Sequence, residues 1–523
     1  MSFLDGLTVN RPGKMSAAEI LVALAQRATV FRAADGDTAY ATFEVNGHRE
    51  TWPVRSKGFR RWLVGQYYRS EGKPPGAQAV IDALGVIEAR AQYDGAVHPV
   101  HVRLAGDDKA IYIDLANDAW QAIEVTASGW RLVSDPPVKF RRARGMLPLP
   151  VPLPTRIGVH ALRPFVNVDS DEQWALILAW LMAALRPSGP YPVLALLGEQ
   201  GTAKSTTQEV LRALIDPNVA PLRAEPMDVR DVMIAASNSW CIAFDNVSDI
   251  EPWLSDCLCR LATGGGFSTR ELYSDGDEMI FVAQRPVMLN GIDAIISRAD
   301  LLDRALIIDL PRIPDHRRRE RQTFWRTFEA ERPVIVGALL NALVGAMRRY
   351  PDVTLASLPR MADFATWAVA AEPGLELEQG TFMRAYLANR DAAHDLALEA
   401  SSIAAAVRAL ADRGPWQGTA AELLEELARI ADDAAKRAKG WPATPRALGA
   451  ALRRVAPNLW HIGIEVAFER QARTGRRLVT VKRRDSTVTI VTTVTPEPPG
   501  DDGDNGDDQH PSLSGLPGWV TEG

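Results

Sequence analysis

The fold is decided by one stretch near the middle of the chain, Val193-Leu194-Ala195-Leu196-Leu197 followed by Gly198-Glu199-Gln200-Gly201-Thr202-Ala203-Lys204-Ser205-Thr206. The apolar residues 193–197 predict a buried strand, and residues 205–214 predict a helix. A Gly-rich turn between a strand and a helix lets backbone N–H groups converge on an anion at the positive end of the helix. The stretch therefore predicts a phosphate-binding loop.

The side chains of this loop suit a nucleoside triphosphate with its magnesium ion. Lys204 is placed to bridge the β- and γ-phosphates, and the Ser205 hydroxyl to hold Mg²⁺. We therefore expect ATP and Mg²⁺ as cofactors, bound by residues 198–206. Ala203 stands where the usual pattern has its last glycine, so its backbone must adopt a conformation that a residue with a Cβ tolerates. A chance loop of similar letters is the alternative.

A second apolar run supplies the acid that such a site needs. Residues 240–244 lead into Asp245, which we expect to coordinate the magnesium ion. An aspartate that merely ends a buried strand is the alternative. Asn246 follows where many such ATPases have a glutamate that polarises water. Hydrolysis would therefore depend on another carboxylate, such as Asp249 or Glu251, or be slow.

Two residues further along the chain complete the predicted catalytic set. The apolar run 286–289 ends at Asn290, which we expect to sense the γ-phosphate and orient water, although the following glycine also makes an ordinary turn pair. A phosphate transition state gains from a cation supplied by a neighbouring subunit. Arg304 is the preferred residue for that role, with a surface ion pair to Asp300 or Asp303 as the alternative.

The composition describes a globular chain with more than one core. At 523 residues, about two to four domains are expected. The three cysteines, at positions 241, 257 and 259, lack the spacing of a zinc site or a disulfide framework, so we expect reduced thiols in the cytoplasm. The longest apolar run, Trp174 to Leu185, is shorter than the ~20 residues that cross a bilayer. No membrane partner is expected.

Composition and periodicity divide the chain into an N-terminal α+β module (1–134), a Pro-rich basic linker (135–154), a phosphate-binding core (155–312), a helical lid (313–412), a basic domain (413–484) and an acidic tail (485–523). The module should contain a hairpin that turns at Asn46-Gly47. Alternating strands and helices in the core favour a parallel sheet. The tail has eight acidic residues and no Lys or Arg, which predicts disorder.

The basic domain has the element order of a winged helix. A helix from Ala420, a second helix that Thr444 would cap, and two strand-like runs at 462–468 and 477–482 follow one another. Residues 436–484 hold thirteen Lys and Arg against two acidic residues, which favours a nucleic-acid partner over a merely solvated basic face. We expect phosphate contacts from Arg446, Arg453, Arg454, Arg473, Arg476 and Arg477.

The order of phosphate loop, Asp245-Asn246, Arg270-Glu271-Leu272-Tyr273, Asn290 and Arg304 resembles superfamily 3 helicases, and more closely the ATPase portion of phage and mobile-element primase-helicases. The resemblance covers about residues 160–410. It implies a P-loop AAA+ type core in a ring, a homo-hexamer, with ATP between subunits. It also implies a hairpin in the central channel, where Arg270 and Tyr273 would contact single-stranded DNA.

Two departures qualify the resemblance. Asn246 replaces the usual second acid, and Asp114 does not reproduce the Asp-x-Asp spacing of a primase, so a separate primase is left open as a partner. The sequence predicts an ATPase, namely a DNA helicase or translocase in the replication of a phage, prophage or plasmid, with duplex DNA bound at the winged helix. The alternatives are a DNA-associated switch that binds ATP with little hydrolysis, and a structural or defence assembly that recruits a partner protein.

Overall fold

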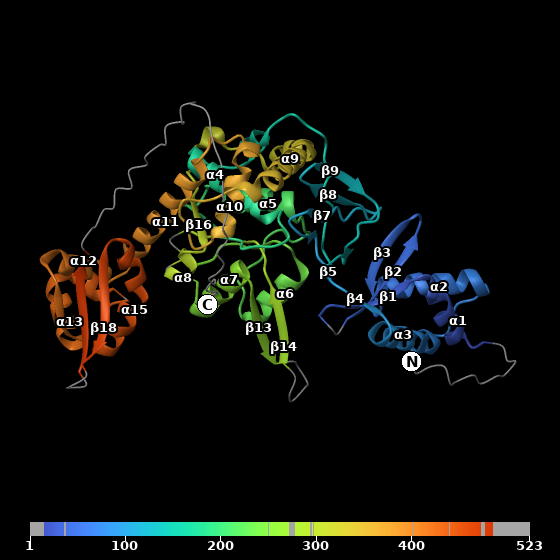
Figure 1. The fold of residues 1–523 in the computed structure, drawn as a ribbon, viewed down its shortest axis with the longest axis horizontal. Coiled ribbons are helices and arrows are strands. Elements are labelled where there is room, and N and C mark those ends of the chain that lie inside the picture. Colours follow the sequence, from blue (N-terminus) through green and yellow to red (C-terminus); the bar gives the residue numbers. More distant parts are fainter. Residues whose placement is uncertain are drawn as a thin grey trace, which may run out of the picture. The chain divides into compact units, whose positions relative to one another are not determined.

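The computed structural model describes residues 15–35, 38–248, 250–270, 278–292, 295–296, 298–399, 401–438, 440–471 and 476–484, with the backbone alone for 267–270 and 278–282. Figure 1 shows these residues coloured along the sequence.

The centre of the fold is a four-stranded parallel sheet. Its strands are β11 (Val193–Leu197), β12 (Ile242–Phe244), β15 (Val287–Asn290) and β16 (Ala305–Asp309), in the order β12-β15-β11-β16. In this register Leu194 lies opposite Met288 of β15 and Leu306 of β16. The parallel sheet predicted from the sequence is confirmed.

Helices cover both faces of this sheet. Leu194 and Leu196 pack in one core cluster with residues of α4 (Asp171–Ala184), α5 (Lys204–Ile215) and α9 (Arg321–Arg349). Val193, Ala195 and Leu197 point the other way, into a cluster with α6 (Val229–Asn238) and α7 (Pro252–Thr263). A strand buried on both faces reads as a continuous apolar run, which is why residues 193–197 do not alternate.

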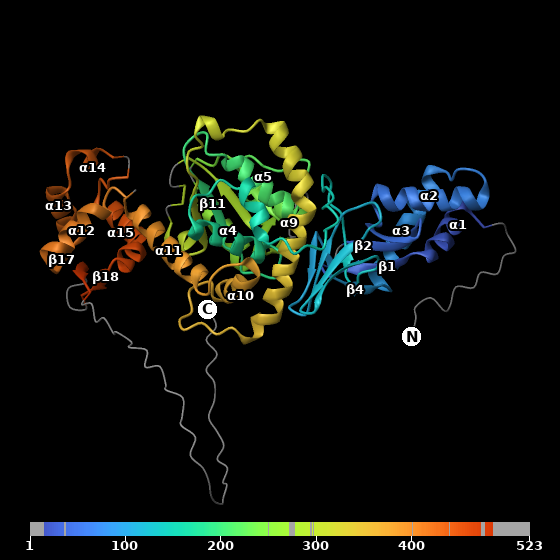
Figure 2. The ribbon, with the colours of Figure 1, turned by 90° about the horizontal axis from the view of Figure 1, so that it is seen from above.

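The helix α9 is the longest in the described part of the chain. It begins the only stretch there, Arg321–Asp352, that is long and apolar enough to cross a membrane, and 61% of its most apolar window is buried inside the protein. Figure 2 shows α9 running beside an antiparallel sheet. A core helix between two sheets accounts for this apolar composition.

That antiparallel sheet consists of β6 (Leu104–Gly106), β7 (Ala110–Asp114), β8 (Ala122–Thr126) and β9 (Gly129–Val133), in this order. Ile111, Ile113 and Ile123 belong to the same core cluster as α4 and α9. The buried guanidinium of Arg103 donates to Asp216, at the end of α5, over 3.0 Å. Residues 103–126 therefore share a core with the parallel-sheet unit, although the sequence analysis grouped them with the N-terminal module.

The N-terminal residues have a core cluster of their own. The strands β1 (Thr29–Ala33), β2 (Ala39–Val45), β3 (His48–Pro53) and β4 (Ala96–His98) form a sheet in the order β3-β2-β1-β4, packed with α1 (Ala17–Leu24), α2 (Lys57–Glu71) and α3 (Ala77–Tyr93). Asn46 and Gly47 have φ values of 49° and 82°. Positive φ at both turn residues is what a two-residue hairpin needs, so the hairpin predicted here is confirmed.

The residues predicted to form a linker, 135–154, include β10 (Lys139–Phe140), which pairs in parallel with β5 (Val100–His101). Within the same segment, Leu149 packs in the main core cluster.

Downstream of the parallel sheet the chain is mainly helical, and its last described part is mixed. After α8 (Ala299–Leu302) and α9 come α10 (Ala362–Ala371) and α11 (Thr381–Glu399). The C-terminal elements are α12 (Ala404–Arg413), β17 (Trp416–Thr419), α13 (Ala420–Ile430), α14 (Asp433–Arg437), α15 (Pro445–His461), β18 (Ile464–Arg470) and β19 (Arg477–Arg483). The strands form an antiparallel sheet in the order β17-β19-β18. Thr444 caps α15 as predicted, since its side chain accepts from the Ala447 N–H.

Candidate functional site

Three parallel neighbours of the sheet end at the same edge, and the predicted site residues follow them there. The loop 198–203 follows β11, Asp245 follows β12, and Asn290 ends β15. Because carboxyl ends of adjacent parallel strands share one edge, residues far apart in the chain meet. The loop and the two polar residues therefore form one site, which also includes the first turn of α5.

The backbone of the loop is shaped by three residues with positive φ, Gly198 at 140°, Gly201 at 87° and Ala203 at 62°. A Cβ on Gly198 would lie 2.8 Å from the carbonyl oxygen of Leu310, so this position requires glycine. Ala203 adopts the left-handed conformation as the N-cap of α5. For a residue with a Cβ that conformation costs about 1–2 kcal/mol, so Ala203 holds the loop under backbone strain.

The side chain of Lys204 folds back over the loop. Its Nζ donates to the carbonyl oxygens of Gly198, at 2.5 Å, and Glu199, at 2.8 Å. Burial lowers the pKa of this ammonium group, and the nearby Asp245 carboxylate partly offsets the effect. Lys204 thus lies over the concave side of the turn, where an anion held by the loop's N–H groups would meet it.

A network of short hydrogen bonds joins Ser205, Asp245 and Asn290. The Ser205 hydroxyl donates to Asp245 Oδ1 over 2.8 Å, and the Asn290 amide donates to the same oxygen over 2.5 Å. The Asn290 oxygen in turn accepts from the backbone N–H of Asn246 at 2.8 Å. The structure therefore brings together the predicted pair Ser205 and Asp245 with Asn290, which fixes the orientation of the carboxylate.

Asn246, the departure from the usual acid, has φ of 56°. Asparagine adopts this left-handed conformation more readily than glutamate does, which gives a local reason for the residue found here. Of the two nearby carboxylates predicted as substitutes, Glu251 accepts from the Trp253 indole N–H at 2.8 Å. Asp249 lies outside the described residues.

Two residues of this site were missed by the sequence analysis. Gln208, fully buried one turn beyond Lys204, accepts from the Asn290 amide over 2.5 Å and donates to the Phe244 carbonyl over 3.2 Å. Asn167 donates to the carbonyl oxygens of Thr202 and Pro311, at 2.9 and 2.7 Å. A buried polar residue on the apolar face of α5 was a usable signal for Gln208, whereas Asn167 gave none.

A cavity of about 1170 Å³ opens beside the loop. Gly201, Ala203 and Thr206 form part of its wall, and α9 contributes Phe324 and Trp325. The segment before α9 adds a set of cationic side chains, Arg312, Arg317, Arg318, Arg319 and Arg321. A cavity with aromatic and cationic walls next to a Gly-rich loop at a helix N-terminus suits a nucleotide, whose base is flat and apolar and whose phosphates are anionic.

Arg304 lies away from this site, at the opposite edge of the sheet. Its carbonyl oxygen accepts from the N–H of Val193, the first residue of β11, whereas the loop follows the last residue. The strand between them spans about 17 Å. The guanidinium pairs with Asp300 and its side chain is only 15% exposed. Arg304 therefore has no contact with the loop of its own chain.

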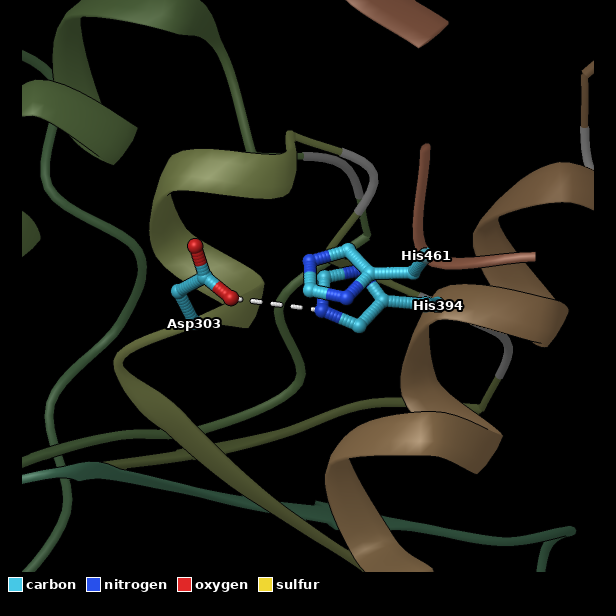
Figure 3. Close-up of side chains that lie close together, drawn as sticks. All are labelled: Asp303, His394 and His461. Carbon is cyan, nitrogen blue, oxygen red and sulfur yellow. Dashed lines mark ion pairs between the residues drawn. The ribbon is translucent and has the colours of Figure 1, made fainter. Parts of the chain in front are cut away.

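Next to Arg304 lies a cluster that the sequence did not reveal, formed by Asp303, His394 of α11 and His461 of α15 (Figure 3). His394 is 2% exposed; its Nε2 lies 3.2 Å from Asp303 Oδ1, and its Nδ1 lies 3.0 Å from Asn458 Oδ1. The His461 ring stacks on that of His394, with centroids 3.9 Å apart. The cluster joins α15 and α11 to the end of α8.

The charges of this cluster argue against a metal ion. Arg360 and Arg390 lie 3.1 and 3.4 Å from the Asp303 carboxylate, which is thus already compensated. The two imidazole planes differ by only 19°, so their nitrogen lone pairs do not converge on a point. Burial alone would raise the pKa of the Asp303 carboxyl, but the hydrogen bond and charge of His394, together with Arg390 and Arg360, lower it to about 2.

The predicted DNA-contacting arginines of the C-terminal domain are exposed where described. Arg446, Arg453 and Arg454 lie on α15, and the Arg453 guanidinium lies 4.7 Å from the ring centroid of Phe468. Arg476 and Arg477 lie at the start of β19. Arg473 lies outside the described residues.

The predicted channel hairpin is present in the backbone. β13 (Gly265–Arg270) pairs with β14 (Glu278–Ala283) in antiparallel register, and Arg270 stands opposite Glu278. The side chain of Arg270 and the whole of Tyr273 lie outside what the structure describes. Their proposed contacts with DNA stay predictions.

Two family models match the chain in succession. Residues 159–397 match the model described as actinomycete integrative conjugative element replication protein, and residues 403–496 match the one described as AICE RepA C-terminal domain. The chain is a replication protein of a mobile element. The first match contains the loop, Asp245, Asn290 and Arg304, and the second contains α15 and β19.

Comparisons with curated proteins and with solved structures gave no match and weak matches, respectively. A search of curated proteins gave no match. Among solved structures, an A-form apo structure of the NrS-1 C-terminal region is 9% identical, covering 90% of this chain and 100% of that one with a TM-score of 0.39. An apo structure of the same region (305–718) is 12% identical, covering 90% and 99% with a TM-score of 0.38.

Replacement of Ala203 by glycine should stabilise the protein. Glycine adopts the left-handed conformation without the steric cost of a Cβ, so Ala203→Gly should raise the unfolding free energy by about 1 kcal/mol. Thermal and urea unfolding measure the change. The control is Ala213→Gly in the same helix, which should lower stability by about 1 kcal/mol because its backbone is helical. Destabilisation by both changes would contradict the strain at Ala203.

The Asp303 cluster should contribute stability that depends on pH. Because the folded pKa of Asp303 is about 2 and the unfolded value is about 4, the contribution is complete above pH ~4 and is lost as the pH falls toward 2. Asp303→Asn should lower the unfolding free energy by about 1–2 kcal/mol at pH 7. Urea midpoints at pH 7, 5, 4 and 3.5 should show this difference shrinking only below pH ~4.

The control for this measurement is Asp315→Asn, because the Asp315 side chain is 90% exposed and its pair with Arg318 is worth little. A pH-independent deficit in Asp303→Asn, or an equal effect in the control, would contradict the account of the cluster.

Proposed function

We propose that this replication protein is an ATP-dependent DNA helicase or translocase. The observation that supports the proposal most is the meeting of Lys204, Ser205, Asp245 and Asn290 at one edge of a parallel sheet, beside a large cavity. A basic residue, a hydroxyl and a carboxylate around a Gly-rich turn are the groups that hold a triphosphate with its magnesium ion.

ATP would lie with its phosphates over residues 198–205 and its base and ribose in the cavity. The Ser205 hydroxyl and the Asp245 carboxylate, 2.8 Å apart, are the groups that would hold Mg²⁺, which neutralises charge on the phosphates. The bond from Asn290 keeps the carboxylate in place. Arg317, Arg318 and Arg319 line the cavity and would add positive charge beside the nucleotide.

A switch that binds ATP with little hydrolysis is a second candidate, and Asn246 favours it. The usual water-polarising glutamate is absent at this position, and Glu251 is engaged with Trp253. Such a switch needs the same phosphate contacts but not rapid turnover. Turnover in the presence of DNA therefore separates the two functions.

We further propose that the chain works as a ring, a hexamer, with Arg304 serving the site of a neighbouring subunit. Arg304 lies at the end of the sheet opposite the loop, so a role at a phosphate site would have to be at the site of another subunit. The ion pair of Arg304 with Asp300 would have to open for this. The ion pairs of Arg360 with Asp300 and Asp303 could then keep the segment 300–303 in place. A primase that acts with this protein would be a separate chain.

The C-terminal domain would dock duplex DNA as a winged helix. Its element order, α12, β17, α13, α14, α15, β18 and β19, and the exposed arginines of α15 and β19 support this role. The hairpin β13–β14 would enter the channel and contact single-stranded DNA.

ATP hydrolysis by the purified protein should be stimulated by single-stranded DNA and lost in Lys204→Ala. The lysine supplies the charge that the β- and γ-phosphates need, so its loss should lower kcat by at least about a hundredfold. Release of phosphate with and without DNA measures the effect, and Lys109→Ala, an exposed lysine outside the site and outside the proposed DNA-binding surfaces, is the control. Tight ATP binding without hydrolysis, with or without DNA, would contradict the helicase or translocase and support the ATP-binding switch.

Mixing two inactive variants should restore activity if the site is shared between subunits. Arg304→Ala keeps the loop and Lys204→Ala keeps the arginine, so a mixed ring contains some interfaces with both groups intact. We expect each variant alone to hydrolyse ATP at under about a tenth of the normal rate, and an equimolar mixture to regain a measurable fraction. No recovery in mixtures that form mixed rings by native mass spectrometry would contradict a role in trans.

A further inference from the structure

The helix α2 of the N-terminal sheet has an exposed face that is basic and aromatic, and it lies outside both family matches. Its buried side is formed by Phe59, Trp62, Leu63 and Tyr67. On a helix with ~100° per residue, Lys57, Arg61 and Tyr68 fall on the opposite side. These three residues are exposed and form a stripe along the helix.

The cations of this face are not used within the chain. Among the residues that the structure describes, no ion-pair partner exists for Lys57, Arg60, Arg61 and Arg69. Other arginines of the same region are paired, Arg49 with Asp135 and Arg55 with Glu88. Glu71 is the only acidic residue of α2 and accepts from Ser70. The face therefore has a local excess of positive charge that the fold does not need.

Tyr68 gives the face a second chemical property. Its side chain is 58% exposed, whereas its neighbour Tyr67 is buried in the core of the sheet. An exposed ring between cations offers a flat surface for stacking as well as charge.

We propose that the outer face of α2 is a binding site for single-stranded DNA. Lys57 and Arg61 on this face, with the exposed Arg60 at its edge, contact backbone phosphates, and Tyr68 stacks on an unpaired base. The anion that complements this charge is a phosphodiester chain, and stacking selects a strand whose bases are free over a duplex, whose bases are already stacked. The site rests on the proposed action on DNA, but it requires neither ATP nor the C-terminal domain.

The test is equilibrium binding of a fluorescent oligo-dT by the full chain without nucleotide, over a range of salt. Arg60→Gln/Arg61→Gln should weaken binding about tenfold and reduce the slope of log K against log salt by about 1.4, since each phosphate contact on a single strand contributes ~0.7. Arg90→Gln/Lys109→Gln, which also removes two exposed positive charges but outside α2, is the matched control and should change neither.

Variants of Tyr68 distinguish the contribution of stacking to DNA binding from that of charge. Tyr68→Ala should weaken binding about fivefold or more with the salt slope unchanged, and Tyr68→Phe, which keeps the ring, should bind normally. Binding of a duplex of equal length should be little affected by Tyr68→Ala. Thermal unfolding verifies that each variant is folded.

An equal loss of oligo-dT affinity in Arg60→Gln/Arg61→Gln and in the control variant would overturn the proposal, because net charge alone would then explain binding. Normal binding by both Tyr68 variants would overturn it as well. The proposed motor fails by a different result, the absence of ATP turnover that depends on Lys204, and that result leaves oligo-dT binding by α2 intact.

Discussion

Everything at the candidate site depends on the parallel pairing of β11 with β15 and of β15 with β12. This pairing brings the ends of three strands to one edge, so that Asp245 and Asn290 meet the first turn of α5 although each is forty or more residues away in the chain. Burial of β11 on both faces holds the strands in this register. A one-residue slip would exchange the two faces and separate the hydrogen bonds of the site.

Two residues at the same edge have an uncommon backbone conformation. Ala203 and Asn246 both have positive φ and neither is glycine. Each such residue persists only where the surrounding structure enforces it. Here Asn290 accepts from the Asn246 N–H, and Asn167 donates to Thr202, the residue before Ala203. The supporting amides of Asn290 and Asn167 are thus part of the site's construction.

The sequence predicted the local features of this site well. The strand 193–197, the helix after the loop and the polar strand ends all follow from short patterns of apolar and polar residues, and the structure brings Ser205, Asp245 and Asn290 together. The roles of these residues, and of Lys204 and Arg304, are still predictions.

What the sequence did not reveal are contacts between distant segments. Asn167, the Arg103–Asp216 pair and the Asp303 cluster each join residues that no periodicity links. The antiparallel sheet β6–β9 was grouped with the N-terminal residues for the same reason, because its packing on α9 is set by tertiary contacts. Local sequence patterns predict secondary structure, whereas the partner of a buried polar side chain is determined by the tertiary fold.

The helix α15 has different chemistry on its two sides. It carries exposed arginines at 446, 453 and 454, and near its end Asn458 and His461 touch His394, which touches Asp303. A helix of 17 residues is about 25 Å long. A tilt of this helix must either carry the Asp303 segment with it or break the buried contacts of His394 with Asn458 and Asp303. The orientation of the exposed arginines is therefore coupled to the position of the Asp303 segment, which adjoins Arg304 in the chain.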